Sequence, residues 1–427
     1  MFSETILQNQ LFLKDLEIKQ RDYEFYDDLR NLNKIISFVW PRRVGKTYLM
    51  LDFIKRFITE GKIVMEQVVF LNLAQYANKT VDPLQILDSY FQKFPDLQPF
   101  FVLDEVQDIA NFRELVLFLF DHHYKVFISG SNSKLLASEL STHFRGRIFE
   151  YKVYPLTFPE VLSFHNFPIK KHYAVTEKAK MKYLYQDVFT YGAFPELVMT
   201  KHAFTKREIL RGYFDILLYK DLIERYKIEN EFNLQYLMEA LTIGFTKEVS
   251  IHKVFTTLKS KNIRVWIQTL YDYYEYLKHV FYSHELTNAF GWKKDRKSYL
   301  YNLGFHTLFS PSPDFGQSFE NVMLLELEKK FGQVFFKRTE AGEKWCEKAS
   351  EIDFFIKTRD AQLFTKDLHI QACYQLNQKN YEREISPLQQ VEGEKVLVYR
   401  EKDEQYPEER DGIKLIDFFD FVGAYLE

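Results

Sequence analysis

A Gly-Lys-Thr triplet at Gly45, Lys46 and Thr47 could do chemistry, because it follows an apolar run and precedes an amphipathic stretch. Backbone N–H groups around the glycine can surround a phosphate, the lysine can bridge β- and γ-phosphates, and the threonine hydroxyl can bind Mg²⁺. A chance surface triplet is the alternative, and the strand–loop–helix context argues against it. The predicted nucleotide contacts are Arg42, Arg43, Val44, Gly45, Lys46, Thr47 and Tyr48.

Trp40 stands where the full pattern G-x-x-x-x-G-K-[ST] has its first glycine. A glycine eases the tight exit from the strand, whereas a bulky indole restricts that turn. We therefore expect Trp40 to affect nucleotide affinity or turnover more than the fold.

Two adjacent carboxylates, Asp104 and Glu105, follow the apolar run at residues 100–103. At the carboxyl edge of a parallel sheet, such a pair faces the ligand crevice. Asp104 is expected to hold Mg²⁺ through water, and Glu105 to polarise the attacking water. Adjacent acids can also simply mark a strand end, but this pair falls on the strand where the chemistry requires it.

Polar and basic residues follow the next apolar run, at 124–130. Asn132 or Ser131 could orient the water between the acidic pair and the γ-phosphate, although both residue types are also common helix N-caps. Arg147, close to Arg145, could reach transition-state charge in its own site or in a neighbouring copy's site, with pairing to surface acids as the alternative. The predicted catalytic residues are Lys46, Glu105, Asn132 and Arg147, and the predicted metal ligands are Thr47 and Asp104.

Apolar runs and helical patterns alternate in the first third of the chain, and these elements must position the groups above. Strands are expected at 34–40, 67–73, 99–104, 124–130 and 148–156, with helices at 46–60, 83–94, 109–122 and 133–140. Runs that are apolar almost throughout suit strands buried on both faces. The alternation predicts an α/β fold with a parallel, doubly wound sheet.

After Pro155 the pattern becomes mainly helical. Residues 176–228 have the periodicity of a helical lid, 234–286 contain short helices and a hairpin near 280–286, and 310–316 (SPSPDFG) form the clearest linker. Further on we expect a helix at 318–330, strands near 333–337, 351–357 and 368–374, a solvated loop at 400–412 and a helix around 415–426.

The overall composition excludes several classes of function. The 427 residues have a formal net charge of −3, so no global basic field attracts nucleic acid or an anionic membrane. The two cysteines, Cys346 and Cys373, cannot form a four-thiolate zinc site and suggest reduced thiols. The start lacks the features of a signal peptide, and no stretch approaches the roughly 18 apolar residues of a membrane span. A cytoplasmic location without a membrane partner is therefore expected.

The order of motifs resembles that of a large family. The segments PRRVGKT, FVLDEV, ISGSNSKLL, FRGRIFEYKVYPLTFPEVL, YGAFPELV and YFDILLYKDLIERY resemble the bacterial and archaeal AAA+ ATPases that carry a C-terminal domain of unknown function. The resemblance continues in YDYYEYLKHVFYSHEL, RKSYLYNLGF, FENVMLLEL and EIDFFI, and so spans most of the chain. It implies that the chain binds ATP and Mg²⁺.

The same resemblance implies an α/β P-loop NTPase fold of the AAA+/ASCE type with three further parts. The expected division is a P-loop core at 1–160, a helical lid at 161–233, a winged-helix-like segment at 234–310, and a C-terminal α/β domain at 311–427 that resembles PD-(D/E)xK nucleases. In that last domain Glu320 and Asp353 match expected acidic positions. Gln371 and Cys373 stand where a glutamate and a lysine are expected, which predicts a binding or scaffolding module with a degenerate site.

Three functions compete at this stage. The leading one is a Mg²⁺-dependent ATPase that switches conformation and regulates a protein partner. A nucleotide-binding scaffold with little hydrolysis is the second, because of Trp40. The third is a DNA-binding effector, for which four basic residues could contact phosphates, although such residues also decorate ordinary solvated helices. These four are Lys253, Lys259, Lys261 and Arg264. The sequence leaves the oligomeric state open.

Overall fold

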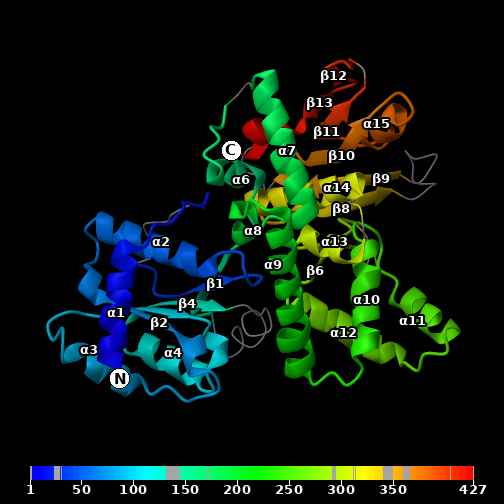
Figure 1. Ribbon diagram of the computed structural model, residues 1–427. Helices are drawn as coiled ribbons and strands as arrows, with labels where there is room; N and C mark the ends of the chain where they lie inside the picture. The colour runs from blue at the N-terminus through cyan, green and yellow to red at the C-terminus, as the bar shows by residue number, and fades with distance from the viewer. Residues whose placement is uncertain are drawn as a thin grey trace. The chain divides into compact units, whose positions relative to one another are not determined.

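The structure is a computed structural model, and its contacts divide the chain into two compact units. It describes residues 2–23, 29, 31–130, 144, 146–170, 173–290, 295–310, 312, 314–339, 350–358, 366–403 and 405–426. The first unit comprises Met1–Tyr154 and His279–Phe281, and the second comprises Pro155–Lys278 and Tyr282–Glu427. Each unit is described by itself below (Figure 1).

A five-stranded sheet forms the centre of the first unit, and every one of its strands was predicted. The strands are β1 (Ile35–Val39), β2 (Val68–Asn72), β3 (Phe100–Asp104), β4 (Lys125–Gly130) and β5 (Ile148–Lys152). They lie in the order β2-β3-β4-β1-β5, and all neighbouring pairs are parallel. The parallel α/β sheet expected from the alternating pattern is thus confirmed. Because β4 lies between β1 and β3, residues that end these three strands meet at one edge.

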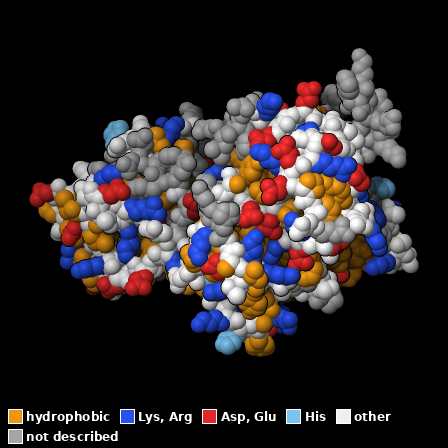
Figure 2. All heavy atoms as spheres, turned by 90° about the horizontal axis from the view of Figure 1, so that it is seen from above, with side chains coloured by type: hydrophobic (Ala, Val, Ile, Leu, Met, Phe, Trp, Pro, Cys, Tyr) orange, Lys and Arg blue, Asp and Glu red, His pale blue; other side chains and the backbone are white. Residues whose placement is uncertain are grey.

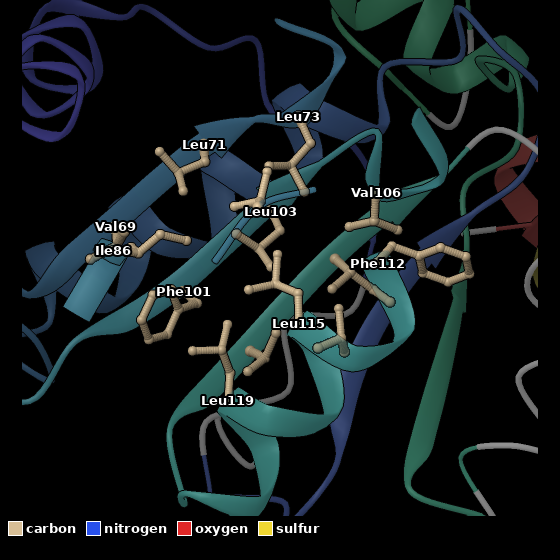
Figure 3. Packing of buried hydrophobic residues seen from close by; sticks show 14 of the residues in the cluster. Val69, Leu71, Leu73, Ile86, Phe101, Leu103, Val106, Phe112, Leu115 and Leu119 are labelled. Atoms are coloured by element: carbon tan, nitrogen blue, oxygen red, sulfur yellow. The ribbon is translucent and has the colours of Figure 1, made fainter. Parts of the chain in front are cut away.

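Helices complete the core of the first unit. They are α1 (Phe2–Asp15), α2 (Lys46–Thr59), α3 (Pro83–Phe91) and α4 (Phe112–Asp121), and the helix expected at 133–140 lies outside the described residues. Alternate strand residues such as Leu71 and Leu103 pack with Ile86 of α3 and Leu115 of α4, as Figure 3 shows. This packing fixes the strand register, since a shift of one residue would turn the apolar side chains away from the helices.

Helix α1 was not predicted, and it covers the edge strand β2. Asn9 Nδ2 donates to the carbonyl of Phe70 (2.6 Å). Gln10 Nε2 donates to the carbonyls of Glu66 (3.2 Å) and Val68 (3.0 Å). These bonds satisfy acceptors that an uncovered edge would present to other chains.

Helices dominate the first half of the second unit, as expected for the stretch after Pro155. They are α6 (Phe158–Phe164), α7 (Val175–Tyr191), α8 (Pro195–Met199), α9 (Ala203–Asp215), α10 (Glu231–Ile243), α11 (Ile251–Ser260) and α12 (Ile267–His279). Residues Ile216–Glu224 continue α9 as a π-helix. The antiparallel hairpin of β6 (Ser283–Thr287) and β7 (Arg296–Leu300) follows, and then the short α13 (His306–Phe309).

A mixed six-stranded sheet forms the end of the chain. Its strands are β8 (Phe335–Thr339), β9 (Ser350–Ile356), β10 (Leu368–Leu376), β11 (Glu394–Lys402), β12 (Glu409–Arg410) and β13 (Ile413–Asp417), in the order β12-β13-β11-β10-β9-β8. The helices are α14 (Phe315–Phe331), α15 (Tyr381–Gln389) and α16 (Phe418–Phe421), followed by a π-helix at Val422–Leu426. Two expectations were wrong in part: residues 400–412 contribute to β11 and β12, and the last helix begins at Phe418 because β13 occupies 413–417. Among the described residues, no helix combines the length and apolar character needed to span a membrane.

Candidate functional site

The loop between β1 and α2 has an unusual backbone. Three of its residues have positive φ: Trp40 (129°), Arg43 (70°) and Gly45 (90°). Turns of this kind can direct successive N–H groups toward one side and form an anion-binding concavity. Helix α2 begins at Lys46, so the N–H groups of its first turn and the positive end of its dipole face the same loop.

The Lys46 ammonium is buried inside this loop. Its side chain donates to the carbonyl oxygens of Trp40 (2.9 Å) and Pro41 (2.7 Å), and the residue is 5% exposed. A buried charge needs such partners. Phosphate oxygens are charged and form stronger hydrogen bonds than neutral carbonyls, so an anion in the loop would compete well for the lysine.

Arg21 supports the loop from outside, and no sequence pattern predicted it. Its guanidinium donates to the carbonyls of Val44 (2.8 Å) and Tyr154 (2.9 Å) and is buried. Tyr23 lies under the same guanidinium, 5.1 Å from Cζ to the ring centroid, and its hydroxyl accepts from the Tyr154 N–H. No motif marks Arg21, because its partners are backbone atoms far away in the sequence.

Asp104, at the end of β3, lies beside Thr47. Thr47 Oγ1 donates to both carboxylate oxygens, at 2.9 and 3.0 Å. Ser129, at the end of β4, donates to the same carboxylate and accepts from the Glu105 N–H (3.2 Å). Burial raises the pKa of Asp104, as does Glu105, while the hydrogen bonds from Ser129 and Thr47 and the charge of Lys46 act in the opposite direction.

Glu105 follows Asp104 in a left-handed conformation, with φ of 52°. Because the backbone turns here, the Glu105 side chain does not continue the alternation of side chains along β3. The carboxylate is half-buried and accepts a hydrogen bond from Gln107 Nε2. Lys46, Thr47, Asp104 and Glu105 therefore meet at one edge of the sheet.

Thr47 and Asp104 fit a Mg²⁺ site of the kind completed by phosphate and water. Their adjacent hydroxyl and carboxylate oxygens are the donors that this hard cation prefers. Within the described residues, no three or more His, Cys, Asp or Glu side chains come together as a metal cage. Such a cage is not needed when the substrate itself supplies oxygen ligands.

Other predicted residues lie differently. Arg147 precedes β5, and its carbonyl accepts from the N–H of Ile35 (2.8 Å), where β1 begins. Because the phosphate loop follows the other end of β1, Arg147 lies at the opposite edge of the sheet, where it pairs with Asp121 (2.9 Å). The structure thus does not bring Arg147 into its own chain's site, and a role in a neighbouring copy stays a prediction.

The remaining loop side chains differ in exposure. Arg43 and Tyr48 are exposed, Arg42 is half-buried, and the buried Val44 offers its carbonyl to Arg21. The predicted water-orienting Asn132, with Ser131 and Arg145, lies outside the described residues.

A second polar cluster lies in the second unit and contains Glu320 and Asp353. Lys297, on β7, points its ammonium at Glu351 (2.6 Å), Glu320 (3.2 Å) and Asp353 (3.9 Å). Burial opposes the charge of Lys297, yet these three carboxylates raise its pKa. No sequence motif points to Lys297 as part of this cluster, because it comes from a different strand than the one that carries Cys373.

This cluster borders an open cleft of about 620 Å³ that also contains Gln371, Cys373 and Glu384. Gln371 Nε2 donates to Glu384 (3.2 Å). Burial, and secondarily Glu384, raises the pKa of the Cys373 thiol to about 12, so the thiol stays neutral. The cleft therefore has an extra carboxylate, Glu384, and Lys297 pairs with the carboxylates at its border, but neither residue stands at the expected motif position.

Comparison with known proteins places the first unit in a defined class. The model of the AAA domain matches residues 32–162, a stretch that contains the phosphate loop, the acidic pair and Ser129. Together with the parallel sheet, this defines a nucleotide-binding P-loop domain of the AAA+ ATPase class.

Two relatives extend over most of the chain. An uncharacterized protein of Methanocaldococcus jannaschii, MJ1544, is 33% identical over 391 residues, which cover 90% of this chain and 84% of that protein. The chain belongs to the same family as MJ1544. An uncharacterized protein of Haemophilus influenzae is 25% identical over 431 residues, with 98% and 99% of the two chains covered. Among solved structures, a Walker-type ATPase of Pyrococcus abyssi matches with a TM-score of 0.41 at 18% identity, over 70% of this chain and 99% of that one.

Proposed function

We propose that this protein is a Mg²⁺-dependent ATPase that uses hydrolysis to switch its conformation and so regulate a protein partner. The convergence of Lys46, Thr47, Asp104 and Glu105 at one sheet edge carries the proposal. These residues supply the four groups that phosphoryl transfer to water needs: a phosphate-binding cation, two metal-facing oxygens and a base.

In this mechanism Lys46 leaves the loop carbonyls and binds the β- and γ-phosphates. Bound Mg²⁺ would neutralise phosphate charge, held by Thr47 and Asp104. Glu105 orients the attacking water and takes its proton as the new bond to the γ-phosphorus forms and ADP leaves. Ser129 holds the Asp104 carboxylate and the Glu105 backbone, so both acids keep their relative positions.

Phosphate release by Glu105→Gln tests this proposal. The amide keeps the shape of the side chain but cannot accept a proton, so we expect a loss of turnover of about 10²-fold or more with ATP binding retained. Asp88→Asn, on an exposed residue of α3, is the control and should behave like wild type. Equal turnover by wild type and Glu105→Gln would remove Glu105 from the mechanism.

A nucleotide-binding scaffold is the alternative within the same fold. Trp40 motivates it, because a bulky side chain with positive φ restrains the phosphate loop. ATP binding by the wild type without phosphate release would favour this scaffold. Measurable Mg²⁺-dependent turnover would exclude it.

DNA binding is a second candidate, favoured by one exposed stretch. Lys253, Lys259, Lys261 and Arg264 are all exposed, and Trp266 beside them is 72% exposed, which suits stacking on a base. Figure 2 shows one face of the molecule, on which Lys and Arg are interspersed with Asp and Glu. We expect a low-salt gel shift with single-stranded DNA to weaken in Trp266→Ala, whereas no shift at all would exclude this candidate.

A further inference from the structure

Trp40 has a backbone conformation that glycine adopts far more easily. Its φ of 129° is outside the regions open to large side chains, at a cost of order 1–3 kcal/mol. Such a conformation persists only where surrounding contacts hold it. The contacts of the indole are therefore informative.

Aromatic side chains surround the Trp40 ring. Its centroid lies 5.4 Å from that of Tyr154 and 4.9 Å from that of Phe281, and Lys152 Nζ lies 5.1 Å from it. Tyr154 and Phe281 are both buried. Phe281 also has positive φ, 57°, so two strained aromatic residues are in contact.

Phe281 comes from a distant part of the sequence. It ends the segment His279–Phe281, which packs with the first unit, whereas Lys278 and Tyr282 on either side belong to the second. Tyr282 is fully buried there: its ring stacks on Phe305 (5.6 Å) and its hydroxyl contacts Thr242. A change at Phe281 is thus one residue away from an anchored side chain of the second unit.

The other side of Trp40 is held by the lysine of the phosphate loop. Lys46 Nζ donates to the Trp40 carbonyl (2.9 Å), so the ammonium restrains the peptide that carries the indole. If Lys46 turns to a phosphate, this restraint is lost. The indole and its stacking on Phe281 then change together.

We propose that the Trp40–Phe281 contact passes the occupancy of the phosphate loop to the segment His279–Phe281, between α12 and β6. Trp40 and Phe281 act as positioning residues that stabilise the loop conformation in which the Lys46 ammonium is held by the carbonyls of Trp40 and Pro41. This inference rests on the proposed ATP site and adds its regulation. A bound nucleotide therefore weakens the Trp40–Phe281 contact. Because coupling between two sites is reciprocal, a change in residues 279–282 also changes ATP affinity.

A double-mutant cycle on ATP affinity tests the coupling, with calorimetry in the presence of Mg²⁺. Phe281→Leu keeps an apolar side chain but removes the ring, and we expect it to tighten ATP binding by about five-fold or more. In a Trp40→Gly background the same substitution should have no effect. Phe281→Tyr keeps the ring, so this variant should retain wild-type ATP affinity.

Two controls separate coupling from general destabilisation. Phe101→Leu makes the same change in the buried core of the first unit, where the ring lies against Tyr124 (5.5 Å), and should leave ATP affinity unchanged. Hydrogen exchange of residues 279–282 should change on ATP binding in the wild type but not in Trp40→Gly.

Each outcome has a separate meaning. Equal affinity of wild type and Phe281→Leu, or the same shift in both backgrounds, would overturn the coupling and leave the ATP site intact. Failure of the wild type to bind ATP would overturn the proposed function and this inference with it.

Discussion

At the scale of single residues, the site combines function with a cost in stability. Asp104 is 3% exposed, and burial raises its pKa, so its charged form is less stable in the folded chain than in the unfolded chain. Buried carboxylates of this kind persist where chemistry needs them. Trp40, in the adjacent phosphate loop, adds a second cost through its positive φ.

Replacing Asp104 by Asn should therefore stabilise the nucleotide-free protein. A raised folded-state pKa means that stability falls as pH rises through the range above the ordinary aspartate pKa, and the amide removes this penalty. We expect a gain of about 1 kcal/mol in the free energy of unfolding at neutral pH, which disappears as the pH approaches that ordinary value. Urea unfolding at several pH values measures it, with the exposed Asp88→Asn as control. A loss of stability at neutral pH would contradict the prediction.

At the scale of elements, α1 protects the edge of the nucleotide-binding sheet. Gln10 is buried and donates to the carbonyl of Val68, where β2 begins, and to that of Glu66 just before it, whereas Gln8 of the same helix is exposed. We expect Gln10→Ala to lower the free energy of unfolding by about 1–3 kcal/mol, because buried carbonyls lose their donor, and Gln8→Ala to have almost no effect. The denaturant midpoints of the two variants test this predicted loss. Equal midpoints would show that α1 does not stabilise the sheet through Gln10.

The sequence predicts the elements of this sheet well because strands buried on both faces are apolar throughout. Runs such as 100–103 therefore mark their own position, and the motif order places Lys46 and Asp104 at one edge. Helix α1 was not predicted, although Phe2 and Ile6 pack into the core and Asn9 and Gln10 donate to backbone carbonyls at β2 and just before it. Arg147 looked close to the site in motif order, but the parallel register puts it at the far edge of the sheet.

At the scale of the whole molecule, residues far apart in the sequence form the polar cluster of the second unit. Lys297 on β7 meets Glu320 on α14 and Glu351 and Asp353 on β9. Only the packing of these three elements brings them together, so no spacing in the sequence reveals the cluster. It behaves as an internal ion-pair network beside the cleft.

Removing the ammonium should destabilise this unit strongly. Lys297→Met leaves buried carboxylates without their shared cation, and we expect a loss of about 3 kcal/mol or more in the free energy of unfolding at pH 7. Without Lys297, which lowers the pKa of Glu351, that pKa rises, so the loss should shrink as the pH falls and the carboxylates protonate. Denaturant unfolding at pH 7 and pH 5 measures this, with the exposed Lys253→Met as control. Equal midpoints of the two variants at pH 7 would contradict the ion-pair account.

Calorimetric titration of the full chain with ATP and Mg²⁺, for wild type and Lys46→Ala, tests the central claim most directly. Because the Lys46 ammonium is the loop's phosphate-binding cation, the account predicts that the wild type binds ATP and that the variant loses most of this affinity. Asp88→Asn, at an exposed position of α3 outside the loop, should bind like the wild type. Absence of binding by the wild type, or equal affinity in Lys46→Ala, would contradict the assignment of this loop as the nucleotide site.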